Sequence, residues 1–437
     1  MNLSKVSLII EIFETWNISF IPVDSFSGSY NHSLWQLFWV GKQNKLSEIL
    51  KALSFQYDGV DAAKQRVNLT RGEWEENFRR DRHCRNVQRF IRAYPNYSQG
   101  LLTCYVLPEQ YNQFRKEQFD SKKRWIGRPC VKSAVLQTRL FQNFSEVKNF
   151  FSGYREKSVV QEDISAPFLF NKRKILLRIF VLITSVNPLR IYVHTSGQIK
   201  IARYTGTRKR RFRGEEFTMW KTFDDLPGVV GCHQWASIWK NTENLVVRGV
   251  LTFTDKLGCT SKELPIVCGI ANQLLVFNVA YDSKLNPHLF DIDFDLDLDR
   301  KELQDSFDER LLHEIYGDYL FLTGVLGYNE AYQKAIERRY NFLCASAEMT
   351  SLCLVPAVKR LVLRLANELA HSGAFRLVYP SLDRRILLEK SYKLSFVEGH
   401  ASTAYDIFTD YFSFEMQNEV LYFKSKKDTK KDTKSHE

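Results

Sequence analysis

Lys174 and Arg178 have the clearest chemical potential, because these two cations stand four positions apart in an apolar segment. Apart from Arg178, residues 175–183 are all aliphatic or aromatic. The run is too short for a helix of average length, so it predicts a buried strand. Side chains alternate along a strand, which puts both cations on one face beside Leu176. Such a pair indicates a site for an anion, and a solvated pair on an edge strand is the competing interpretation.

Aspartates alternate with apolar residues over positions 291–299. Strand geometry would place all of these carboxylates on one face. The row resembles a calcium-binding loop, but Leu296 stands where such a loop needs its glycine, so we exclude an EF-hand. For Asp297 and Asp299, an acidic strand edge leading into the next helix is the competing interpretation.

Strands and a helix that could position these residues are visible around them. A second strand, Leu189–Val193, follows the first at hairpin distance, after the turn signal Asn187-Pro188. Apolar residues recur at helical spacing from Leu303 to Leu320, which predicts a core-facing helix after the acidic row.

A basic helix is predicted to begin near Asp81, which would cap it. Its apolar positions, Val87, Phe90 and Ile91, would face the core, and its arginines would face water or a partner. His83, within this helix, is interpreted as an ordinary surface residue that binds no metal.

Composition limits the class of protein. A chain of 437 residues with 44% hydrophobic content can bury a large core and suggests two or three subdomains. The apolar run Val6–Phe13 is too short to span a bilayer, so no membrane segment is expected. A cytoplasmic location is the expectation. Eight cysteines without a Cys-x-x-Cys pair favour reduced thiols.

The net charge of +12 predicts an acidic partner. Nucleic acid, an anionic membrane and an acidic protein tail all qualify by charge. A nucleic-acid partner is not expected, because no known RNA-binding module is recognisable. The basic run Arg208–Arg213 is either a loop for an acidic peptide or a solvated turn.

The segment 159–193 resembles the nucleotide-binding cleft of the tubulin tyrosine ligase-like family. That family carries Gln-x-Tyr-Ile-x-x-Pro, then Lys-Phe-Asp-Leu-Arg, an aromatic residue, Val-Leu-Val-Thr and Pro-Leu-Arg. Twelve residues follow this pattern in order: Gln161, Ile164, Pro167, Lys174, Leu177, Arg178, Val181, Leu182, Thr184, Pro188, Leu189 and Arg190. Further motifs at 65–68, 79–95, 107–129, 277–293 and 369–380 extend the resemblance across most of residues 60–380.

The resemblance implies an α/β (α+β) ATP-grasp-like fold. Its expected parts are an N-terminal α/β subdomain (1–105), a central ATP-grasp subdomain (106–200), a C-terminal ATP-grasp subdomain with the metal motif (201–380), and an extension with a disordered basic tail (381–437).

The same resemblance assigns site residues for ATP and Mg²⁺. Gln161 takes the position that contacts adenine, and Arg128 replaces a phosphate-binding lysine; Lys174 and Arg178 are the cations expected to bind nucleotide and to act in catalysis. Asn278, Asp291 and Asp293 stand where the family has an Asp, a Glu and an Asn around the metal.

The implied function is ATP-dependent ligation through an acyl-phosphate. A free amino acid, most simply glutamate, would be added to the glutamate-rich tails of tubulin or a similar acidic protein, at microtubules of the cytoskeleton, with a cilium or basal body included. Three departures favour the alternative of a catalytically silent scaffold that binds tubulin or an active ligase. These are the absence of glycine from 131–142, Leu176 in place of an acidic residue, and Asn278 in place of a carboxylate.

Overall fold

We analysed a computed structural model of the 437-residue chain. It describes residues 7–18, 37–39, 66–68, 78–118, 123–130, 139–151, 157–186, 189–202, 217–223, 231–254, 271–293, 306–326 and 356–379, with isolated positions at 228, 230 and between 331 and 341. Contacts group the chain into two compact units, Met1–Leu326 with Ser372–Tyr379, and Gly327–His371 with Pro380–Glu437. The site described below lies entirely within the first unit.

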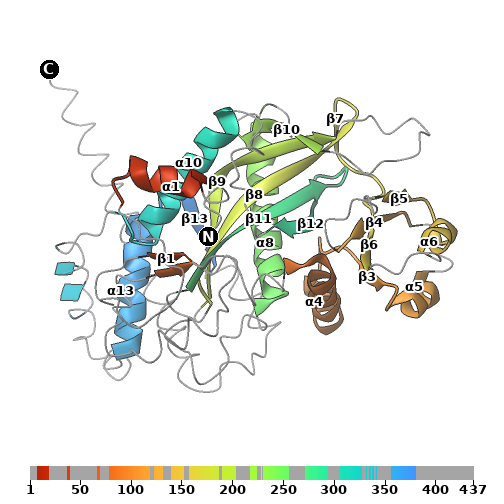
Figure 1. The fold of residues 1–437 in the computed structure, drawn as a ribbon, viewed down its shortest axis with the longest axis horizontal. Coiled ribbons are helices and arrows are strands. Elements are labelled where there is room, and N and C mark those ends of the chain that lie inside the picture. Colours follow the sequence, from red (N-terminus) through yellow and green to blue (C-terminus); the bar gives the residue numbers. More distant parts are fainter. Residues whose placement is uncertain are drawn as a thin grey trace. The chain divides into compact units, whose positions relative to one another are not determined.

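The larger sheet is built around a long hairpin of β8 (Arg173–Val186) and β9 (Leu189–Ala202) (Figure 1). Both predicted strands are confirmed, and both are longer than their apolar runs. The interior of β8 is buried at consecutive positions because both faces of the sheet are covered, which explains the unbroken apolar run.

Seven further strands complete this sheet, in the order β1-β2-β11-β8-β9-β10, with β12 on β11, β13 on β9 and β7 on β8. They are β1 (Leu37–Trp39), β2 (Arg66–Asn68), β7 (Leu169–Phe170), β10 (Phe217–Thr222), β11 (Ala271–Tyr281), β12 (Pro287–Asp293) and β13 (Phe375–Tyr379). Neighbouring strands from β12 across β11 and β8 to β10 run antiparallel.

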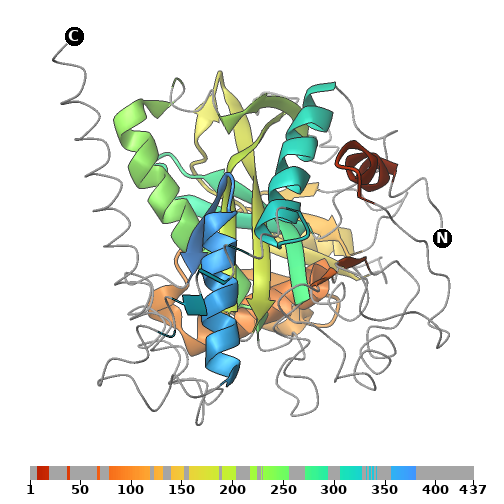
Figure 2. The same cartoon turned by 90° about the vertical axis from the view of Figure 1, so that its left-hand side faces the viewer.

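Two long helices, α8 (Cys232–Leu251) and α10 (Ser306–Leu322), lie on opposite sides of this sheet (Figure 2). The core-facing stripe predicted for α10 is confirmed at Leu311, Leu312, Ile315 and Leu320, which are all buried. Leu303 lies outside the described residues. A short helix at the start of the chain, α1 (Ser7–Thr15), contacts α10.

The smaller sheet has the order β3-β6-β4-β5. Its strands are β3 (Cys104–Leu107), β4 (Trp125–Pro129), β5 (Arg139–Phe141) and β6 (Ser158–Glu162). Helices α5 (Tyr111–Gln118) and α6 (Phe144–Phe151) contact it and share an aromatic core in which Phe114 meets Trp125 edge to face, with ring centroids 4.9 Å apart. Trp125 of β4 and Val160 of β6 belong to this core, and both strands contribute to the candidate site.

Helix α4 (Arg80–Ala93) packs on β3 and β6. Val87 and Phe90 are buried as predicted, but Asp81 is not the cap. The helix begins at Arg80, with Arg79 at the N-cap, so Asp81 lies in the first turn and pairs with Arg79 at 3.3 Å. A carboxylate there still favours the helix, because it faces the positive end of the helix dipole.

The expectation that all thiols are reduced is wrong for one pair. Cys84 on α4 and Cys104 at the start of β3 form a disulfide, with their Cα atoms 5.8 Å apart. They are twenty residues apart in the chain, and only the packing of α4 on β3 brings them together.

In the second unit, α13 (Pro356–Ala370) carries a buried ion pair between Arg364 and Glu368 at 3.2 Å. None of the described helices is both long and apolar enough to cross a lipid bilayer. The basic run 208–213, the segment 131–138, the residues beyond Asp293 in the acidic row, and the tail after 380 lie outside the described residues.

Candidate active site

A row of polar side chains crosses four strands of the larger sheet. Asn278 on β11 is paired in register with Asp291 on β12 and with Arg178 on β8, and Arg178 is paired in turn with Gln198 on β9. Directly paired residues of antiparallel strands point to the same face. Arg178 donates a hydrogen bond to Oε1 of Gln198 at 2.9 Å. The fold thus aligns Arg178 with Asn278 and Asp291, which are about a hundred residues away in the chain.

Asn278 offers an unused oxygen at the centre of this row. Its Nδ2 donates to Oδ2 of Asp293 at 2.8 Å, while its Oδ1 is buried and has no hydrogen-bond partner among the described residues. A buried polar atom without a partner is costly, so such an atom calls for a ligand or a water. Amide and carboxylate oxygens are the donors that Mg²⁺ prefers, so Asn278 and Asp293 fit such an ion.

Arg128 reaches this row from β4 of the smaller sheet. Its guanidinium donates to Oδ2 of Asp291 at 2.8 Å, to the carbonyl oxygen of Phe290 at 2.9 Å and to Oε1 of Gln161 on β6, and it lies over the Phe290 ring. Only 6% of Arg128 is exposed. The predicted phosphate ligand, adenine contact and metal ligand are therefore brought together, and they bind one another.

A second arginine holds the same carboxylate. Arg80, at the start of α4, donates through Nε to Oδ2 of Asp291 at 3.2 Å and through Nη1 to the carbonyl oxygen of Pro129 at 2.9 Å. Burial alone would raise the pKa of Asp291, but the Arg128 and Arg80 guanidiniums outweigh it and hold this pKa below its usual range. Asp291 is therefore ionised at physiological pH. Arg80 belongs to the motif at 79–90, and no separate signal in the sequence marks it as a partner of Asp291.

The prediction that His83 is an ordinary surface residue is wrong. His83 lines a small pocket together with Arg80 and Val87 of its own helix and with Arg128 and Asp291. Removal from water lowers the pKa of His83 to about 4, in spite of the nearby Asp291 charge. The imidazole is therefore neutral at physiological pH. The helical spacing of positions 80, 83, 84 and 87 was the signal that these side chains share one face.

Lys174 stands apart from the row. Its Nζ pairs with Oδ1 of Asp163 at 3.1 Å, and Asp163 also pairs with Arg124 at 3.0 Å. Lys174 and Arg178 are four positions apart on the strand, a span of about 13 Å. Leu176, between them, is buried. The anion that Lys174 meets is therefore a carboxylate of the chain itself, just after β6.

The depressed pKa of His83 makes stability fall in acid. In the unfolded chain His83 takes up a proton near pH 6.5, whereas in the folded chain it does so near pH 4. The unfolded state therefore binds one more proton than the folded state as pH falls through this window. The resulting loss of free energy of unfolding is largest below pH 4, where it amounts to roughly 3 kcal/mol. Urea unfolding measures the free energy of unfolding at pH 7 and at pH 4.5, and its decrease between the two should be smaller for His83→Asn than for the wild type. Equal decreases in the two proteins would contradict the lowered pKa of His83.

Comparisons with known proteins identify a family that this chain resembles. Residues 60–209 match the model of the tubulin-tyrosine ligase family. The chain is 24% identical over 392 residues to human tubulin polyglutamylase TTLL6, covering 80% of this chain and 41% of that protein. It is 22% identical over 261 residues to mouse tubulin monoglutamylase TTLL4, covering 52% of this chain and 21% of that protein. The chain thus spans less than half the length of these relatives.

Among solved structures, the chain resembles the C-terminal domain of K. lactis Pby1, an ATP-grasp enzyme that interacts with the mRNA decapping enzyme Dcp2. The TM-score is 0.50 at 13% sequence identity, over 73% of this chain and 89% of that one. At this identity the likeness speaks for the fold alone. The predicted α+β ATP-grasp-like fold is confirmed, while the subdomain boundaries stay predictions.

Proposed function

The chain is a divergent member of the tubulin-tyrosine ligase family, and from that premise we propose that it is an ATP-dependent ligase that adds an amino acid to an acidic protein tail. Glutamate is the amino acid and the glutamate-rich tail of tubulin the acceptor that the relatives' names favour. The net charge of +12 suits such a tail. The observation that carries the proposal is the polar row of Asp291, Asn278 and Arg178 facing Arg128 and Gln161.

The reaction would proceed in two steps. An oxygen of the acceptor carboxylate attacks the γ-phosphorus of ATP and ADP leaves; the amino nitrogen of the free amino acid then attacks the acyl carbon, phosphate leaves, and an amide bond forms as the nitrogen loses its proton to solvent. Arg178 would hold the acceptor carboxylate and stabilise the charge that develops on it. Gln161 would contact the adenine edge, and Arg128 would bind phosphate through its planar fork.

Asn278 Oδ1 and the carboxylate oxygens of Asp293 and Asp291 would hold Mg²⁺. The ion would neutralise charge on the transferred phosphoryl group. Oδ2 of Asp291 can join this set only if it leaves Arg128 and Arg80, because both guanidiniums now donate to that atom. Nucleotide phosphates offer the two arginines an alternative anion, so binding of ATP and release of Asp291 would be coupled.

That ion pair also favours a second candidate function. Asp291 is paired with two arginines, and Gln161 is bound by one of them, Arg128. These polar groups therefore have hydrogen-bond partners without nucleotide. Such a chain could bind a tubulin tail or an active ligase and perform no ligation. Both functions place the protein at the microtubule cytoskeleton of the cytoplasm, cilia and basal bodies included.

Two measurements separate the candidates. Incubation with microtubules, ATP and Mg²⁺ should incorporate labelled glutamate in preference to labelled glycine or tyrosine, and ATP with Mg²⁺ should raise the melting temperature. Sedimentation with microtubules without incorporation, and without a shift at millimolar ATP, would overturn the ligase and support the binding protein.

A further inference from the structure

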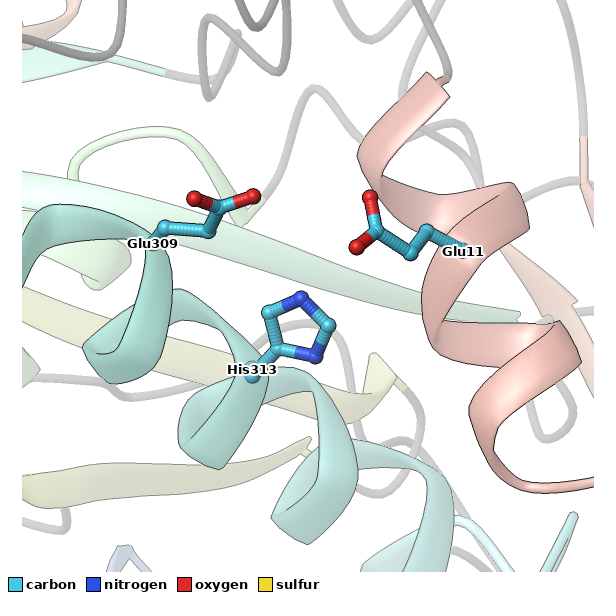
Figure 3. A group of neighbouring side chains, drawn as sticks. All are labelled: Glu11, Glu309 and His313. Atoms are coloured by element: carbon cyan, nitrogen blue, oxygen red, sulfur yellow. The ribbon is translucent and has the colours of Figure 1, made fainter. Parts of the chain in front are cut away.

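A cluster of potential metal ligands lies well outside the site described above. Glu309 and His313 stand four residues apart on α10, and Glu11 faces them from α1; one ligand atom from each lies within 4.8 Å of the other two. Figure 3 shows the two glutamates and the imidazole directed into the same space between the helices. Positions four apart share one face of a helix, so α10 presents its two ligands together.

The third ligand is held in place by the packing of α1. Ile12 and Phe13, which follow Glu11, are buried. One turn later the indole of Trp16 meets the ring of Phe321 edge to face, with centroids 5.4 Å apart. Gly317 lies against the same indole. The contact of Trp16 with Phe321 and Gly317 therefore holds α1 on α10 next to the cluster, and the approach of Glu11 to His313 is supported by apolar packing as well as by the reach of the side chain.

The side chains of this cluster are of the types that bind cations. Two carboxylates meet at a half-buried position, where their mutual repulsion is stronger than in water. All three side chains are only partly buried, so an ion from solution can reach them.

We propose that Glu11, Glu309 and His313 bind a zinc-class divalent transition metal that joins α1 to α10. One imidazole and two carboxylates suit zinc, which takes nitrogen and oxygen ligands at about 2.0–2.2 Å and accepts three protein ligands with water in the fourth position. Ligands on one such ion lie roughly 3–4 Å apart, so modest side-chain rotations close the present spacing. The ion would tie the start of the chain to the helix that covers β9 and β13.

Zinc titration of metal-free protein is the test, by calorimetry and by thermal unfolding. We expect one zinc per chain at this site with micromolar or tighter affinity and a raised melting temperature. Glu309→Gln and His313→Asn, which nearly preserve side-chain shape, should each weaken binding at least tenfold. Glu14→Gln is the matched control, because Glu14 is exposed on the same helix as Glu11 and removal of its charge should leave the affinity unchanged.

Cobalt binding identifies the ligands. Because the chain has eight cysteines, zinc could bind elsewhere through thiolates, and Co²⁺ at the proposed site should show a nitrogen and oxygen ligand spectrum without a thiolate charge-transfer band. Circular dichroism of the metal-free variants should match the wild type, which separates loss of a ligand from loss of fold. Zinc affinity unchanged in His313→Asn, equal weakening in Glu14→Gln, or a response to Mg²⁺ but not to zinc would each overturn the proposal.

Discussion

Replacement of Asp291 by alanine is expected to lower the free energy of unfolding by about 3–5 kcal/mol, because it leaves a buried guanidinium without its counter-charge. Arg128 is 6% exposed and donates to this carboxylate at 2.8 Å. Arg80 would lose the same partner, but it is more exposed and keeps the carbonyl oxygen of Pro129. Urea unfolding at pH 7 measures the loss.

A double-mutant cycle separates the ion pair from the packing around it. Arg128→Met removes the buried charge. In that background, Asp291→Leu should lower the free energy of unfolding much less than it does in the wild type, because no buried cation is left unpaired. Additive losses would show that the two side chains contribute independently, contrary to the contact described. Lys123→Ala is a suitable control, because its ion pair with Glu162 is exposed and should contribute about 0–1 kcal/mol.

The same pair determines how nucleotide could bind. The predicted phosphate ligand and the predicted metal ligand neutralise each other, so ATP and Mg²⁺ must compete with an internal contact. Arg128→Met with Asp291→Leu would remove that contact and both ligands, and the double variant should stay folded yet show no ATP response. The double variant would thus lose the ATP response while it keeps its stability, whereas a single variant at either position would lose both.

Local pattern was enough to predict the scaffold. The apolar runs of β8 and β9 identified a buried hairpin, and helical spacing identified α10. The strands extend beyond those runs, to Arg173 at one end and Ala202 at the other, because cross-strand hydrogen bonds continue where the side chains become polar. Hydrophobic periodicity marks which side chains are buried, and it carries no information about where the ladder of backbone pairs ends.

The site needed information that no local pattern contains. The register that aligns Arg178 with Asn278 depends on β11, which joins β8 from a hundred residues away. Lys174 pairs with Asp163, just after β6 of the smaller sheet, whereas Arg178 donates to Gln198 on β9, so two cations four positions apart have different partners. A lone histidine predicts a surface residue, whereas His83 shares its helix face with Arg80 and Val87 and lines the site with them. The Cys84 and Cys104 disulfide likewise depends on packing between α4 and β3.

Replacement of Arg178 by glutamine should lower amino-acid incorporation by about 10²–10³, if the ligase function holds. A preorganised group that stabilises developing charge typically contributes this much to the rate. Arg178 is the cation of the polar row, and its hydrogen bond to Gln198 fixes its orientation. Because the proposed role is exerted during the reaction, kcat should fall more than KM rises, and the ATP-induced thermal shift should persist.

Arg173→Gln is the matched control, since it removes the same charge from an exposed position of the same strand and should leave incorporation near the wild-type rate. Thermal unfolding of both variants identifies any loss that comes from folding alone. A fall in incorporation of equal size in the two variants would assign the effect to the basic charge of β8 that attracts the acidic tail. A fall confined to Arg178 would assign it to charge stabilisation in the row, because only that guanidinium lies beside Asn278 and in line with Asp291.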